Sequence, residues 1–138
     1  MAMPGWIILR DDVKRDELEI ARLGWLSNPA STGAKHLTVI EGTFLSGKGH
    51  SFHDHADQAE LIYVVSGTLD HWIEQEKRTL SPGDSVFMPA SIVHATFNTG
   101  IGDAKLIAIL GPSAGEIGVE QIDVPSEAPW NELKANAV

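Results

Sequence analysis

The sequence predicts an all-β fold, a sandwich or a barrel made of many short strands. Short runs rich in β-branched and aromatic residues follow one another closely over residues 36–110. Glycine or proline separates most of these runs, and no long segment has helical periodicity. The length of 138 residues suits one domain, its apolar fraction of 43% is enough for a packed core, and no internal repeat is visible.

Strands are predicted wherever such a run is bounded by turn residues. The first clear strand, residues 36–45, places Leu37 and Val39 on one face and Thr38 and Ile40 on the other. The charged residues 74–78 predict the exposed end of a hairpin, and residues 81–84 predict a tight turn around Pro82-Gly83. Further strands are expected at residues 50–55, 60–65, 68–74, 79–80, 85–88, 93–98, 104–110 and 119–124.

The two ends of the chain give weaker patterns. Residues 1–34 are predicted to be an N-terminal extension with an edge strand: a short strand at 6–9, a loop followed by a strand or turn over 13–26, and a loop at 28–33. Residues 125–138 are predicted to be a tail with one helical turn near 130–134. Residues 35–124 then form the barrel.

Composition excludes several classes of protein. The chain has no cysteine, so it can form neither disulfides nor thiolate metal sites. Its net charge of −9 and its lack of a basic cluster disfavour nucleic-acid binding. No apolar run approaches the ~20 residues that cross a bilayer, and the N-terminus has no basic leader, so we expect no membrane association and a cytoplasmic location.

Chemically informative residues are concentrated in residues 47–67, GKGHSFHDHADQAELIYVVSG. His53 and His55 are two residues apart, so they share one face of a strand. Glu60 begins the next strand, and His94 is the natural candidate for a fourth ligand from a later one. Imidazoles combined with a carboxylate favour a first-row divalent metal.

These residues also resemble the two cupin motifs, and the resemblance covers roughly residues 35–110. The first motif, G(X)5HXH(X)3,4E(X)6G, matches at every fixed position, which are Gly47, His53, His55, Glu60 and Gly67. The second motif, G(X)5PXG(X)2H(X)3N, matches at Gly83, Pro89, His94 and Asn98. Ser91 stands where the family usually has glycine, a departure that affects the turn and not the ligand.

The resemblance implies a single cupin jelly-roll β-barrel with a short C-terminal tail. It also implies one divalent transition metal ion, held inside the barrel by His53, His55, Glu60 and His94. Iron, manganese, nickel, copper and zinc all suit these ligands. Four protein ligands leave a position open for substrate, water or O₂, which favours chemistry over a structural role.

Strand alternation predicts which side chains share the pocket with the ligands. Ile62 and Val64 should follow Glu60 inward, Thr96 and Asn98 should follow His94, and His71 and Ile73 should share a face. His71 is a candidate base or substrate donor, although a satisfied polar residue or a surface histidine is the more frequent case.

The predicted pocket is largely apolar, which favours a small aromatic or carbonyl-bearing substrate. The phenylalanines of the chain are most simply core residues. We expect His36 and His50 to lie away from the pocket, at the periphery.

Three functions are consistent with these features. The first is a dioxygenase or other oxygenase that acts on a small phenolic or enolisable carbonyl substrate, with Glu60 as ligand and catalytic base. The second is a redox-neutral isomerase, lyase or decarboxylase in which the ion acts as a Lewis acid. The third is a non-catalytic module that binds a small molecule.

A homodimer is expected, because cupins commonly pair and a small jelly roll exposes sheet edges. The apolar residues 6–9 are the predicted part of that contact.

Overall fold

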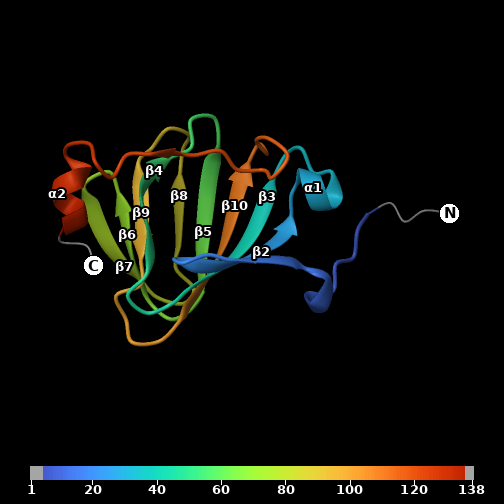
Figure 1. Ribbon diagram of the computed structural model, residues 1–138, viewed down its shortest axis with the longest axis horizontal. Coiled ribbons are helices and arrows are strands. Elements are labelled where there is room, and N and C mark those ends of the chain that lie inside the picture. The colour runs from blue at the N-terminus through green and yellow to red at the C-terminus, as the bar shows by residue number, and fades with distance from the viewer. Residues whose placement is uncertain (1–4, 136–138) are drawn as a thin grey trace.

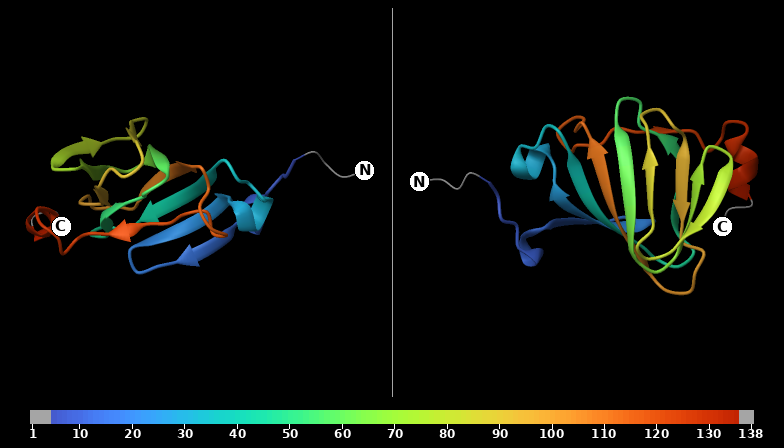
Figure 2. Two further views of the ribbon diagram at one scale, coloured as in Figure 1. Left: turned by 90° about the horizontal axis from the view of Figure 1, so that it is seen from above. Right: turned by 180° about the vertical axis from the view of Figure 1, so that it is seen from behind.

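A computed structural model describes residues 5–135 and shows a barrel of two antiparallel sheets, seen in Figures 1 and 2. The six-stranded sheet has the order β1 (Lys14–Glu17), β2 (Ala21–Ser27), β3 (Thr38–Phe44), β10 (Ala104–Gly111), β5 (Ala59–Ser66) and β8 (Ser85–Met88). The five-stranded sheet has the order β11 (Ile122–Asp123), β4 (Gly49–Asp54), β9 (His94–Phe97), β6 (Leu69–Ile73) and β7 (Glu76–Leu80). The predicted all-β jelly roll is confirmed.

The main core lies between the sheets. In β3 and β10 every second residue is buried, and the register pairs Ile40 with Ala108 on the inner face. These inward side chains join Phe44, Ile62 and Leu106 in one apolar cluster. The alternation read from the sequence over residues 36–45 therefore gives the correct faces, as expected for a sheet with one face on a core.

A second apolar cluster covers the other face of the five-stranded sheet. Phe52 and Trp72 pack edge to face there, with ring centroids 5.7 Å apart, beside Ala95 and Phe97. The short helix α2 (Trp130–Ala135) packs Trp130 against this cluster, at the left of Figure 1. Strand β9 is consequently buried on both faces, which makes it a rigid support for the residues that it carries inward.

The N-terminal region differs most from the sequence-based expectation. Residues 6–9 form no strand, and Trp6 and Ile7 are 68% and 71% exposed on a segment that extends away from the barrel (Figure 2). After the 3₁₀ turn η1 (Arg10–Asp12), strands β1 and β2 form a hairpin that extends the six-stranded sheet. Because β1 is almost entirely exposed while β2 is partly buried, no single period describes residues 13–26.

Two other predicted elements have different bounds in the structure. Residues 28–33, predicted as a loop, contain the single-turn helix α1 (Pro29–Thr32). The Asn28 side chain accepts a hydrogen bond from the Ser31 amide at 2.9 Å, and Gly33 ends the turn with a φ of 74°. The predicted strand at 119–124 is reduced to the two residues of β11, and the rest of that segment is irregular.

No helix among residues 5–135 is long and apolar enough to cross a membrane. The homodimer and the cytoplasmic location stay predictions.

Ser91, at the position where the second cupin motif usually has glycine, keeps the conformation that glycine favours. Its φ is 70°, in the left-handed region. Its backbone amide donates to the His55 carbonyl at 2.9 Å, and its hydroxyl donates to the Ala56 carbonyl at 2.9 Å. The hydroxyl bond offsets the cost of the left-handed backbone, so the turn that precedes His94 is retained.

Replacing Ser91 tests this compensation. Ser91→Ala keeps the strained backbone but loses the hydroxyl bond, so we expect it to lower the free energy of unfolding by about 1 kcal/mol. Ser91→Gly loses the same bond but removes a strain of similar size, so its stability should stay within about 0.5 kcal/mol of the parent. Urea unfolding measures both, and a Ser91→Ala protein as stable as the parent would contradict this account.

Candidate metal centre

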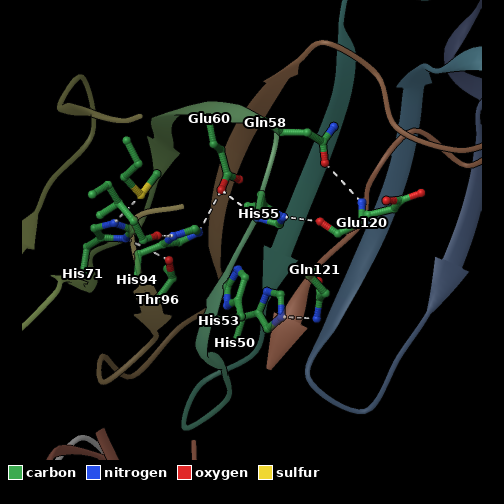
Figure 3. Close-up of polar contacts among 12 residues, drawn as sticks. His50, His53, His55, Gln58, Glu60, His71, His94, Thr96, Glu120 and Gln121 are labelled. Carbon is green, nitrogen blue, oxygen red and sulfur yellow. Dashed lines mark hydrogen bonds and ion pairs between the residues drawn. The ribbon is translucent and has the colours of Figure 1, made fainter. Parts of the chain in front are cut away.

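Four potential ligands converge at the inner end of three strands (Figure 3). His53 comes from β4, His55 from the residue just after it, Glu60 from β5 and His94 from β9. All four are buried, between 2% and 7% exposed, and their ligand atoms lie within 4.8 Å of one another. Direct pairing of His53 with His94 across β4 and β9 brings segments 41 residues apart together, and the structure thus unites the ligand set that the sequence predicts.

The backbone selects which nitrogen of each histidine faces the centre. His53 Nδ1 lies 2.6 Å from the Ser51 carbonyl, His55 Nδ1 lies 2.8 Å from the Glu120 carbonyl, and His94 Nδ1 lies 2.9 Å from the Ile92 carbonyl. A carbonyl can only accept, so each Nδ1 carries the proton in the neutral ring. The three Nε2 atoms are then left with free lone pairs, which is the state a metal ligand requires.

The centre of the cluster is short of hydrogen bonds. Glu60 Oε1 lies 2.9 Å from His94 Nε2 and 3.3 Å from His55 Nε2. Even so, Glu60 Oε1 and His94 Nε2 are both fully buried and have no hydrogen bond of acceptable geometry. Buried polar atoms left in this state are costly, and a divalent cation between them would satisfy both. The residues present therefore fit a metal ion.

The site's ionisation favours the same conclusion. Burial acts to raise the pKa of Glu60, but His55 and His94 beside it lower that pKa well below its ordinary value, so the carboxylate is ionised. Burial disfavours the charged form of His55, yet the Glu60 carboxylate raises the pKa of His55 overall. The pKa of His53 is well below its ordinary value because of burial and the neighbouring His50. An ionised carboxylate and neutral imidazoles are the ligand states that a divalent ion requires.

One buried amide organises the segment that holds His55. Gln58 donates through Nε2 to the carbonyls of Pro112 and Gly118, both at 2.8 Å. Its Oε1 accepts from the Glu120 amide at 3.1 Å, as Figure 3 shows. Because the Glu120 carbonyl in turn accepts from His55, Gln58 fixes the outer partner of a ligand.

The four potential ligands line one part of a cavity of about 400 Å³. Most of its lining is apolar and comes from the six-stranded sheet and the β1–β2 hairpin, including Leu23, Trp25, Ile40, Phe44, Ile62, Leu106, Ala108 and Leu110. Apart from the ligands, the polar lining residues are Asp16, His50, Thr96 and Gln121. A chamber of this size and polarity suits a small, mostly apolar molecule with few oxygen atoms.

Of the six predicted pocket residues, two line the cavity and four lie elsewhere in the barrel. Ile62 and Thr96 line the cavity. Val64 and Ile73 do not line it: Val64 is part of the main core, and Ile73 packs against that core. Asn98 lies at another point of the barrel, where Nδ2 donates to the carbonyls of Phe44 at 2.9 Å and Gly102 at 2.8 Å and Oδ1 accepts from the Gly100 amide. His71 is buried directly behind Thr96, and its Nδ1 lies 2.9 Å from the threonine hydroxyl oxygen.

His50 lines the cavity, so the expectation that it is peripheral is wrong. Its ring stacks on His53 with centroids 3.7 Å apart. Burial lowers the pKa of His50 to about 4. His50 and His53 are three residues apart, and regular alternation would place them on opposite faces. A bulge between them, where two residues of β4 face one of β9, turns both inward. The sequence GHSFH contains no feature that predicts this bulge.

Gln121, Asp16 and Trp25 are among the other cavity residues that sequence reasoning missed. Gln121 lies in the irregular segment before β11, and its Nε2 lies 3.1 Å from His50 Nε2. Asp16 accepts a hydrogen bond from the Trp25 indole at 2.8 Å within the β1–β2 hairpin. Their positions depend on how that hairpin and that segment fold over the barrel end, which local sequence patterns do not encode.

Fold and site together define a small β-barrel with a buried three-histidine, one-glutamate centre at the base of an apolar cavity. The sequence pattern of the cupin domain matches residues 40–110, and the chain belongs to the cupin family.

The chain is also similar to individual proteins over most of its length. Protein SchB of Streptomyces halstedii is 26% identical over 127 residues, covering 88% of this chain and 92% of that protein. Polyketide synthase CurC of Streptomyces cyaneus is 27% identical over 127 residues, covering 90% of this chain and 82% of that protein. Among solved structures, KdgF from Halomonas sp. has a TM-score of 0.72 at 22% identity, covering 82% of this chain and 98% of that one, which supports the fold.

The role of Gln58 can be tested against Asn98, which is bonded in the same way elsewhere in the barrel. Each is a buried amide that donates to two carbonyls and accepts from one amide. We expect Gln58→Met and Asn98→Leu each to lower the free energy of unfolding by about 2–3 kcal/mol. Only Gln58→Met should also weaken Zn(II) binding, by about 10- to 100-fold, because it releases the partner of His55.

Competition with a chromophoric chelator measures the affinity and urea unfolding the stability. Equal Zn(II) affinities in the two variants would show that Gln58 has no special role at the centre.

Proposed function

We propose that this protein is a metal-dependent enzyme, a dioxygenase or related oxygenase that acts on a small phenolic or enolisable carbonyl substrate. The observation that carries the proposal is the arrangement of three imidazoles and one carboxylate at the base of a mainly apolar cavity. Four protein ligands leave room for further ligands on a five- or six-coordinate ion, and the cavity gives a substrate access to that side.

The chain's own residues would divide the work as follows. His53, His55, Glu60 and His94 would hold one divalent ion. When bound, that ion supplies Lewis acidity toward a substrate oxygen and, if it is redox-active, a route to O₂ chemistry. Glu60 is ionised and lines the cavity, so its carboxylate is placed to accept the proton of a substrate hydroxyl.

The cavity supports the substrate class. Trp25, Phe44 and Leu106 give it apolar walls, and about 400 Å³ accommodates a molecule of one to a few rings. The similarity to a protein named polyketide synthase points the same way, because polyketide chains and their aromatic products consist of enolisable carbonyls and phenols. A substrate of polyketide type therefore fits both the pocket and the similarity.

The alternative is a redox-neutral isomerase, lyase or decarboxylase. The same four ligands bind redox-inert zinc well, and Lewis-acid activation of an enolisable carbonyl needs no O₂. The two functions share a site and a substrate class, so the ion and the requirement for O₂ separate them.

Oxygen uptake tests the proposal directly. We expect the Fe(II)- or Ni(II)-loaded protein to consume O₂ with at least one member of a panel of naphthols, polyhydroxylated aromatics and 1,3-diketones. Glu60→Gln should lower that rate by about 10²-fold or more because the charged ligand and base is lost. Glu76→Gln, which changes an exposed carboxylate on β7, should leave the rate unchanged.

The other outcomes separate the alternatives. Turnover of the same panel by the Zn(II) protein under argon would support the redox-neutral reaction. Tight binding of these compounds without turnover under any condition would instead indicate a binding module.

A further inference from the structure

A polar row lies beside the metal ligands on the inner face of the five-stranded sheet. Strand pairing aligns His50 with Thr96 and Thr96 with His71 across β4, β9 and β6. The neighbouring row holds His53 and His94. Two residues along a strand span about 6.6 Å, so the polar row is roughly one aromatic ring away from the ligand row.

Thr96 is the member of this row whose hydrogen-bonding role can be derived. It lines the cavity, whereas His71 lies behind it. His71 Nδ1 is 2.9 Å from Thr96 Oγ1, and His71 Nε2 is 3.3 Å from Met88 Sδ (Figure 3). All three residues are buried.

The thioether fixes the direction of the hydrogen bonds. A methionine sulfur can accept but cannot donate, so His71 must carry its proton on Nε2. Nδ1 of the neutral ring is then an acceptor, and the Thr96 hydroxyl donates its proton to it. His71 is buried, which disfavours the charged form of its ring. Thr96 Oγ1 uses its proton in this bond and keeps lone pairs that can accept a hydrogen bond.

Gln121 and His50, two other polar residues of the cavity lining, already have partners. Gln121 Nε2 donates to Asp123 Oδ1 at 2.9 Å and lies 3.1 Å from His50 Nε2. His50 also stacks on His53, so its ring forms a flat wall beside the ligands.

We propose that Thr96 is a specificity-determining acceptor that recognises a second hydroxyl on the substrate, with His71 as the positioning residue that holds the threonine in that role. The inference rests on the proposed function and narrows its substrate class. The preferred substrate carries one oxygen that reaches the metal and, about one ring away, an O–H that donates to Thr96. A methyl ether or a hydrogen atom at that position cannot donate and should bind less well.

Matched aromatic probes test this discrimination. The probes are a set of dihydroxynaphthalenes that differ in ring position, each with its monomethyl ether and the corresponding naphthol. Calorimetry with the Zn(II)-loaded full chain measures their affinities. For the best-placed isomer we expect the dihydroxy compound to bind about 3- to 10-fold more tightly than its ether or naphthol.

Three variants test whether Thr96 and His71 cause the preference for the dihydroxy compound. Thr96→Val keeps the side-chain shape and should abolish the preference while leaving naphthol affinity nearly unchanged. Thr96→Ser keeps the hydroxyl and should retain the preference. His71→Phe removes the acceptor of the threonine hydroxyl, so Thr96 can donate to a ligand. The ratio of the affinity for the dihydroxy compound to that for its ether should then fall toward one. A purely structural effect would lower both affinities and leave their ratio unchanged.

The failures are distinguishable. If the parent binds naphthols but shows no hydroxyl preference, or if Thr96→Val retains it, the inference is overturned and the proposed function stands. If the parent binds none of these aromatics, the proposed substrate class fails and the inference fails with it.

Discussion

The site depends on three hydrogen bonds from histidine side chains to backbone carbonyls. They hold Nδ1 of His53, His55 and His94 as donors, and they direct three Nε2 lone pairs toward one carboxylate. Without a cation, Glu60 Oε1 and His94 Nε2 are buried with no well-formed hydrogen bond, a state that proteins seldom tolerate without a functional reason. The arrangement is therefore pre-organised for metal binding, because the backbone has fixed the ligand orientation in advance.

Strand pairing and core packing hold the ligands in place. Antiparallel pairing of β4 with β9 places His53 opposite His94, and the second apolar cluster packs the outer face of both strands. Gln58 fastens the segment before β11, whose Glu120 carbonyl orients His55. The six-stranded sheet and its hairpin add the apolar walls. One sheet thus carries most of the chemistry and the other most of the chamber, which explains how a chain of 138 residues encloses a cavity as well as a core.

Sequence reasoning was reliable where function depends on spacing and alternation. The four ligands could be predicted because the sequence matches the two cupin motifs, and because two-residue spacing puts His53 and His55 on one face. It was unreliable where the chain departs from regular pairing. The bulge in β4 turns His50 into the cavity. Alternation alone could not show that the core residue Ile62 also lines the cavity whereas the core residue Val64 does not. The roles of Thr96 and His71 follow from their contact with each other and with Met88, and these contacts join three strands.

X-ray absorption of the Ni(II)- or Zn(II)-loaded protein can show whether three imidazoles and one carboxylate bind one ion. We expect one ion per chain, with a first shell that contains three imidazole nitrogens and at least one carboxylate oxygen at about 2.0–2.2 Å. His94→Ala should remove one imidazole from that shell, whereas His36→Ala, at an exposed position, should leave it unchanged. A shell with fewer than two imidazoles, or one that His94→Ala does not alter, would contradict the account.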